Sequence, residues 1–74
     1  MTMKQSTREL VEGNWKQFRG RIKEAWGAVT DDDLQRVEGR YEQLLGMLEE
    51  RTGRDRAEIE RKLEDMTREL EAHR

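Results

Sequence analysis

The 74-residue chain contains no cysteine and no proline. Without cysteine it can form no disulfide, no thiolate metal site and no thiol nucleophile. Without proline, no residue interrupts a helix by removing a backbone donor. β-Branched residues are few, whereas Glu, Arg, Leu and Gln are common, and this composition favours helices. We therefore predict an all-α fold, a small bundle of four to five short helices within a single domain over residues 1–74.

Long apolar runs are also missing. No stretch approaches the roughly 18 residues that a membrane-spanning helix needs, and the opening MTMKQST lacks the apolar segment of a secretory signal. Hydrophobic residues make up 32% of the chain and charged residues 43%, whereas an average globular protein has about 45–50% and 25%. A core in so small a chain seldom supplies more than about 3–5 kcal/mol net. We expect a marginally stable fold, a fold that relies on self-association, or a partly ordered chain.

Neither sign of charge dominates, because 15 basic and 17 acidic residues leave a net charge of −2. This balance excludes a strongly basic nucleic-acid coat and an acidic tail. Residues 1–27 nevertheless carry a net +3 and residues 28–53 a net −4. We favour charge complementarity between these two regions, within the domain or between copies. The alternative is weak DNA or membrane-surface contact through the one basic patch: Lys16, Arg19, Arg21 and Lys23.

Catalytic side chains are scarce. The only serine is Ser6 and the only histidine is His73, so nucleophilic catalysis has no evident base beside a hydroxyl. The acidic run at residues 31–33 lacks the alternating ligand spacing of a calcium loop and fits the start of a helix. We therefore predict no catalytic, cofactor-binding or metal-binding residues, and we expect no cofactor and no small-molecule substrate.

The six glycines point to an internal repeat. A shift of 26 residues aligns VEGNWKQFRGRIKEAWG (11–27) with VEGRYEQLLGMLEERTG (37–53), with seven identities in 17 positions. Such self-similarity predicts an internal helical repeat, although a chance origin in a chain of low diversity stays open. The aromatic and aliphatic residues of each copy fall on one helix face. We expect these two apolar stripes to be core, each covering the other, rather than a stacking surface for bases.

The glycines themselves divide by position. Gly27 and Gly53 are expected to end helices in the left-handed conformation. Gly13 and Gly39 are expected to separate shorter helices. The other two lie within a helix, where glycine costs about 1 kcal/mol relative to alanine; a close neighbouring helix, a bend or a docked partner would each explain them. Together with the basic patch they form a candidate interaction surface: Lys16, Arg19, Gly20, Arg21, Lys23 and Gly46.

Capping-box patterns place the helix starts. The pairs are Ser6 with Glu9, Asn14 with Gln17, Thr30 with Asp33, and Asp55 with Glu58. They predict helices over about 6–12, 14–26, 31–38, 40–52 and 55–72, although 31–52 could also be one bent helix.

The charged C-terminal helix, 55–72, carries a narrow apolar seam of Ile59, Leu63, Met66 and Leu70. Such a seam either docks on the rest of the domain, which we favour, or pairs with another chain to give a homo-oligomer.

Three segments resemble a known family: GNWKQFRGRIKEAWG, the acidic step TDDDL, and VEGRYEQLLGMLEER. Over about residues 9–60, the domain core, the chain resembles the CsbD-like family of bacterial general stress-response proteins. The resemblance implies a cytoplasmic helical domain with a SAM-domain-like fold, no enzymatic activity and no established molecular role, and it transfers no site residues. The chain departs from the family pattern at Arg40-Tyr41 and in the tail after Arg54.

Two functional classes follow. The resemblance and the lack of a catalytic constellation favour a non-enzymatic stress-response protein that acts by binding or assembly, with an unknown partner. The mean hydropathy of −1.21 and the high charge are also typical of a hydrophilic protectant that stays hydrated and weakly structured in dilute solution. Nucleic-acid or membrane contact is expected to be weak at most.

Overall fold

The computed structural model describes residues 7–72 and contains five α-helices. They are α1 (Thr7–Gly13), α2 (Trp15–Ala25), α3 (Asp31–Arg36), α4 (Tyr41–Thr52) and α5 (Arg56–Ala72). The predicted all-α bundle is confirmed, and each helix lies within about two residues of its predicted bounds. None of these helices is both long enough and apolar enough to cross a membrane.

The segment 31–52 is two helices rather than one bent helix. Gly39 adopts a φ of 71°, a left-handed conformation that glycine reaches at little cost because it has no Cβ. The chain therefore reverses between α3 and α4. Gly53 has a φ of 70° and ends α4, as predicted.

Gly27 does not act in this way, and the prediction for it is wrong. The cap of α2 is Trp26, in an extended conformation, and its N–H donates to the carbonyl of Ile22. The side chain of Trp26 is buried in the core, at 8% exposure. Helix α2 therefore ends at a residue whose ring is packed in the core, and not at Gly27.

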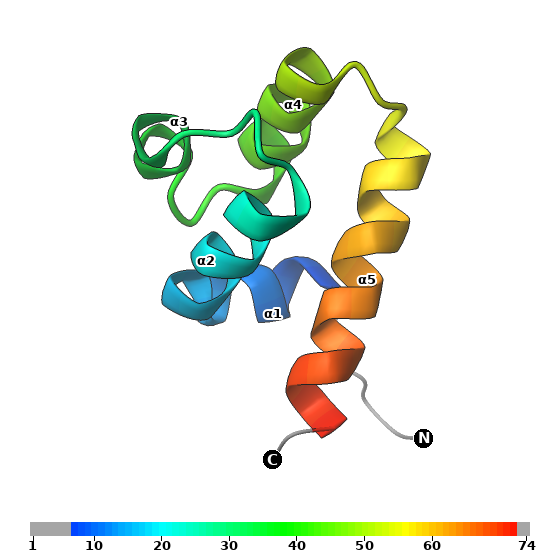
Figure 1. Ribbon diagram of the computed structural model, residues 1–74. Coiled ribbons are helices and arrows are strands. Elements are labelled where there is room, and N and C mark those ends of the chain that lie inside the picture. The colour runs from blue at the N-terminus through cyan, green and yellow to red at the C-terminus, as the bar shows by residue number, and fades with distance from the viewer. Residues whose placement is uncertain (1–6, 73–74) are drawn as a thin grey trace.

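The arrangement of the helices differs from the predicted mutual cover of two repeats. In Figure 1, α5 runs along one side of the molecule, α1 crosses near its C-terminal half, and α4 lies beside its N-terminal half. The extensive helix contacts are those of α5 with α4 and α1, and of α1 with α2 and α4. The main helix neighbour of α2 is thus α1, and the main neighbours of α4 are α5 and α1, so α2 and α4 do not pack extensively on each other.

One hydrophobic core joins all five helices. The aligned positions of the two proposed repeats are buried alike: Trp15 and Tyr41 at 7% and 6% exposure, and Phe18 and Leu44 at 0%. The repeat itself and the SAM-domain likeness stay predictions. Each fully buried aliphatic or aromatic side chain contributes about 1.5–3 kcal/mol relative to exposure. The fully buried side chains are Val11, Phe18, Ile22, Leu34, Leu44, Leu45, Leu48, Ile59 and Leu63.

The seam of α5 packs on the rest of the domain. Ile59 and Leu63 are fully buried, Met66 is 6% exposed, and Leu70 packs against the edge of the core. This is the favoured of the two predicted arrangements. A homo-oligomer through the C-terminal helix stays a prediction, and it would have to use a face of α5 other than this seam.

The predicted capping boxes have different outcomes. Thr30 and Asp33 form one: Asp33 N–H donates to Thr30 Oγ1 at 3.1 Å and Thr30 N–H donates to Asp33 Oδ2 at 3.2 Å. Asn14 does not cap α2 with its side chain, because its Nδ2 donates to the carbonyl of Leu10 at 2.9 Å. The box of Asp55 with Glu58 stays a prediction, and Glu58 Oε2 lies 2.6 Å from Arg54 Nη1. Ser6 lies outside the described residues.

Helix α4 is capped from a distance. Arg40, at its N-cap position, makes no side-chain capping bond. The backbone N–H of Tyr41 instead donates to Glu12 Oε2 at 2.8 Å, so the end of α1 supplies the carboxylate that the positive end of α4 favours. This contact joins segments 29 residues apart.

Replacing Glu12 by alanine should lower the free energy of unfolding by about 0.5–2 kcal/mol, the usual cost of losing an N-cap. Chemical denaturation followed by tryptophan fluorescence would measure it. Glu38→Ala is the matched control, because Glu38 is aligned with Glu12 in the proposed repeat and is exposed. Equal destabilisation by the two substitutions would contradict the capping role.

Candidate functional site

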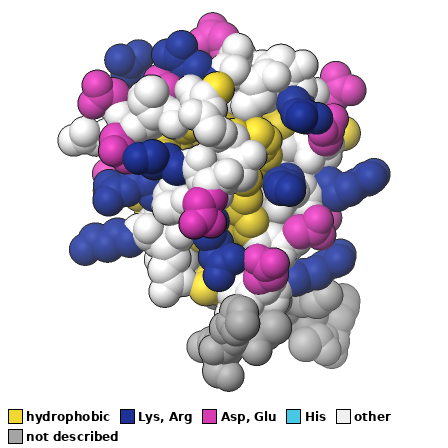
Figure 2. Space-filling view, in the orientation of Figure 1, with side chains coloured by type: hydrophobic (Ala, Val, Ile, Leu, Met, Phe, Trp, Pro, Cys, Tyr) yellow, Lys and Arg dark blue, Asp and Glu magenta, His cyan; other side chains and the backbone are white. Residues whose placement is uncertain are grey.

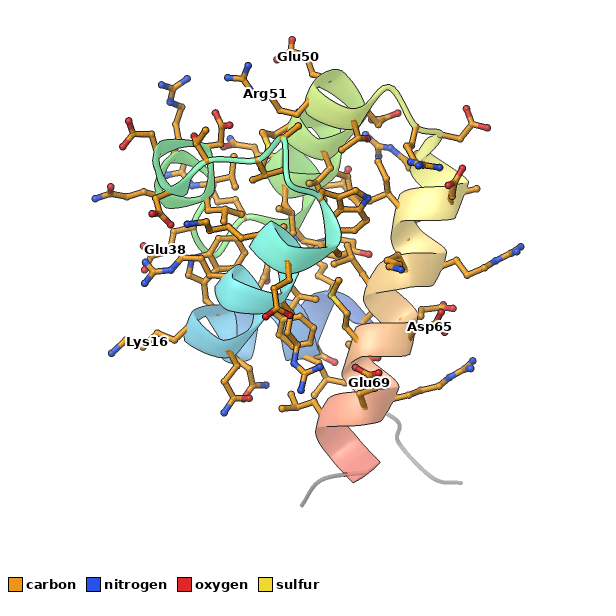
Figure 3. The ribbon with its side chains drawn as sticks, in the orientation of Figure 1. Lys16, Glu38, Glu50, Arg51, Asp65 and Glu69 are labelled. Atoms are coloured by element: carbon orange, nitrogen blue, oxygen red, sulfur yellow. The ribbon has the colours of Figure 1, made fainter. Side chains whose placement is uncertain are left out.

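The predicted interaction residues of α2 do not form one surface. Residues three, four and seven apart share a helix face, which places Lys16, Arg19, Gly20 and Lys23 together on the solvent side, where all four are exposed. Arg21 points elsewhere: its Nη1 lies 2.7 Å from Glu69 Oε1 on α5. Figure 3 shows Lys16 and Glu69 on different sides of α2. The basic patch is therefore divided.

Charge complementarity within the domain accounts for part of the patch. Lys23 Nζ lies 3.1 Å from Asp31 at the start of α3, which joins the basic first region to the acidic second one. Both side chains are substantially exposed, and such pairs contribute about 0–1 kcal/mol. Lys16 and Arg19 have no ion-pair partner among the residues described, so two of the four cations face solvent unpaired.

Gly20 and Gly46 are not packing points within the domain. A Cβ built at either position meets no atom within 4 Å, and both residues are exposed. Of the three explanations offered for these glycines, a neighbouring helix that approaches closely inside the domain is therefore wrong. A bend and a docked partner stay open.

Gly46 also lies apart from the α2 residues, on the exposed side of α4 among carboxylates. Arg56 of α5 reaches this side and spans two of them, with Nη1 3.2 Å from Glu42 and Nη2 3.2 Å from Glu49. These hydrogen bonds to Glu49 and Glu42 raise the pKa of Arg56. The predicted set thus belongs to two helix faces, one basic and one acidic.

An open groove of about 380 Å³ lies between α2 and α5. The Arg21–Glu69 ion pair joins its two walls, and Figure 2 shows a narrow strip of hydrophobic side chains bordered by charges of both signs on this side. Side chains of mixed charge do not converge on one ligand group, so the groove has no evident chemical selectivity. It is lined by Arg21, Glu24, Ala25, Lys62, Asp65, Met66 and Glu69.

Asp33 is the buried carboxylate of the described core, at 4% exposure. Besides the capping box, its Oδ1 accepts a hydrogen bond from Arg51 Nη2 at 2.9 Å. The Arg51 guanidinium, followed by the Thr30 backbone, holds the pKa of Asp33 below its ordinary value of 3.8. The same hydrogen bond raises the pKa of Arg51. This carboxylate therefore links α3 to α4 and stays ionised at neutral pH.

Tyr41 carries the only phenolic hydroxyl, and it is not poised for proton transfer. Burial, reinforced by the charges of Glu60, Glu64 and Glu42, raises its pKa to about 12.

The indole N–H of Trp15 is buried without a hydrogen-bond acceptor in the described structure. Among the described side chains, no group of three or more metal-ligating residues is arranged around a possible ion. His73 lies outside the described range.

The sequence did not predict three polar contacts between helices: Glu12 with the start of α4, Arg51 with Asp33, and Arg56 with Glu42 and Glu49. Each joins residues that are distant along the chain or on different helices, so periodicity carries no signal for it. Only the contact of Glu12 could have been suspected from the sequence. Arg40 stands at the N-cap position of α4, where Ser, Thr, Asp or Asn is preferred, so another residue has to supply the cap.

Comparison with known proteins matches the region in which the sequence resembles the CsbD-like family. A family model described as CsbD-like matches residues 9–61. The UPF0337 protein YjbJ of Escherichia coli (strain K12) is 47% identical over 53 residues, which cover 72% of this chain and 77% of the relative. The UPF0337 protein PA4738 of Pseudomonas aeruginosa is 44% identical over 59 residues, covering 80% and 91%. No solved structure gives a significant match.

Asp33 should make stability depend on acid. Its folded pKa is lowered, so its contribution is present above about pH 4 and is lost as the pH falls through the folded value. Asp33→Asn should therefore lower the melting temperature clearly at neutral pH, and by less at an acidic pH well below the ordinary value of 3.8. Asp32→Asn, at the exposed neighbouring position, is the control. A deficit for Asp33→Asn that is the same at both pH values would contradict the assignment.

Proposed function

This chain belongs to the CsbD-like family, and from that premise we propose that it acts in the bacterial general stress response by binding or assembly, without catalysis. The resemblance of its motifs to that family supports the stress-response role and a cytoplasmic location. The molecular partner is a separate question, which the family does not answer.

The proposal rests on the positions of the aromatic side chains and of the buried carboxylate, none of which is available to a ligand. The aromatic side chains at 15, 18, 26 and 41 are in the core, so they are unavailable as a stacking platform for bases. The buried carboxylate Asp33 is occupied by Thr30 and Arg51. What remains outside is a set of charged helix faces, which suit contact with another macromolecule better than chemistry on a small one.

A protectant role is the second candidate, favoured by the 43% charged residues and the mean hydropathy of −1.21. That role needs a hydrated chain rather than a particular packing. The continuous core described above favours the packed domain instead. A weak DNA or membrane-surface role is less well supported, because Arg21 and Lys23 are engaged by Glu69 and Asp31.

One substitution separates the first two roles. Phe18→Ala removes a fully buried ring at a cost of about 3–5 kcal/mol, which is comparable to the whole stability expected of so small a domain. Circular dichroism should show loss of the cooperative melt. Gln17→Ala, at the exposed neighbouring position, is the control and should melt like the wild type.

Both variants would then be expressed in a bacterial strain that lacks its own CsbD-like protein, at abundances matched by immunoblotting. Survival of the stressed cells should be restored by the wild type and Gln17→Ala, and not by Phe18→Ala. Equal rescue by the unfolded variant would favour the protectant role. Turnover of a substrate by the purified protein at ordinary enzymatic rates would overturn the proposal.

A further inference from the structure

Two exposed helix faces are centred on Gly20 and Gly46, the two glycines within helices that no neighbouring helix of the described chain approaches. We name the first the basic face, made of Lys16, Arg19, Gly20 and Lys23 on α2. The second is the acidic face, made of Glu42, Gly46, Glu49 and Glu50 on α4. Within residues 7–72, no helix of the same chain packs over either glycine.

The two faces have the same layout with opposite charge. Each has a charged residue four positions before its glycine and another three positions after it: Lys16 and Lys23 around Gly20, and Glu42 and Glu49 around Gly46. If two such helices crossed at their glycines, each lysine would lie near a glutamate whether the helices ran parallel or antiparallel. The match therefore does not depend on a particular docking direction.

The glycines fit a close crossing. Neither has a positive φ, so the backbone conformation does not require glycine. Each costs the helix about 1 kcal/mol relative to alanine. The distance between packed helices depends on the side chains at the contact, and a missing side chain on both partners allows the backbones to approach closely.

Existing ion pairs do not block the two faces. Arg56 on Glu42 and Glu49, and Asp31 on Lys23, are exposed pairs of the kind that contributes about 0–1 kcal/mol and exchanges readily. With these partners included, the acidic face keeps an excess of negative charge and the basic face an excess of positive charge. The small overall charge of −2 also leaves little general repulsion between copies.

We propose that a second copy of this chain is the partner, and that the basic face of one copy docks on the acidic face of the next. Figure 3 shows Lys16 and Glu50 extending from the body on different sides, so the contact joins unlike surfaces and is head-to-tail. Such contacts generate rings or open chains. A single helix crossing is smaller than the roughly 1,000 Å² of a stable interface, so the association is weak and favoured by high concentration. This inference rests on the proposed function, in which the protein acts by binding or assembly, and it names a second copy of the chain as the partner.

Sedimentation velocity over a roughly hundredfold range of concentration would test the association itself. The mean mass of the wild type should rise with concentration at low ionic strength. It should fall toward the monomer near physiological salt, where the Debye length shortens from about 30 Å to about 8 Å. A monomer at the highest concentration and lowest salt would overturn the proposal. It would leave the stress-response role intact, because that role is tested by survival of cells.

Two charge reversals identify the faces. Lys16→Glu and Glu50→Lys change exposed side chains, neither of which makes an ion pair with a described residue. Each substitution should weaken self-association about five- to tenfold. Mixing the two variants should restore binding, because the first keeps an intact acidic face and the second an intact basic face. The mixture should favour two-chain complexes over longer assemblies.

The matched controls are Lys62→Glu and Asp65→Lys, the same changes of charge on exposed positions of α5. They should leave the association near that of the wild type. Equal weakening by the controls, or a mixture no stronger than its components, would show that charge acts only generally and would overturn the assigned faces.

Substitution of the glycines tests the close crossing. Gly20→Gln and Gly46→Gln should each raise the melting temperature by roughly 2–6 °C, because glutamine is the better helix former and a Cβ at either position meets no atom within 4 Å. Both should weaken self-association, because the new side chain separates the helices. Raised stability with unchanged association would contradict the role of the glycines in docking.

Discussion

The fold depends on closing one small core with the seam of α5. Only 32% of the residues are hydrophobic, so the domain has few apolar side chains to lose. Ile59, Leu63 and Met66 of α5 cover the apolar stripes of α1 and α4. Helices α2 and α4 do not pack extensively on each other, so the stripe of α4 depends on α5 for cover. Without α5, the apolar side chains of the other helices would face water. The charged C-terminal helix is therefore part of the domain rather than an appendage to it.

Polar contacts between distant segments hold the helices in place around that core. Glu12 caps α4, Asp33 binds Arg51, and Arg56 spans two carboxylates of α4. A chain without cysteine has no covalent link between its helices, and short helices leave many backbone groups unsatisfied at their ends. These contacts satisfy some of those groups and orient α3, α4 and α5 relative to one another.

Because the apolar residues are used inside, the functional potential of the molecule lies in its charged exterior. The surface is neither uniformly basic nor uniformly acidic, and its charges are sorted by helix. Lys16 and Arg19 on α2 have no ion-pair partner within residues 7–72, and α4 carries an excess of carboxylates. A protein of this kind is suited to weak, salt-sensitive contacts that depend on concentration, which agrees with a role in binding or assembly.

The sequence alone determined the fold class, the helix bounds to within about two residues, the buried stripes and the family. These depend on residues close together in the chain, such as the periodicity of Phe18 and Ile22, the Thr30–Asp33 box and the glycine at 53. The tertiary structure decided which helices cover which. It also decided that Gly20 and Gly46 face solvent, and that the predicted interaction residues lie on two separate faces. A helical pattern states which side of a helix is apolar, but it carries no information about the neighbour that side meets, because that choice is made by the packing of the whole chain.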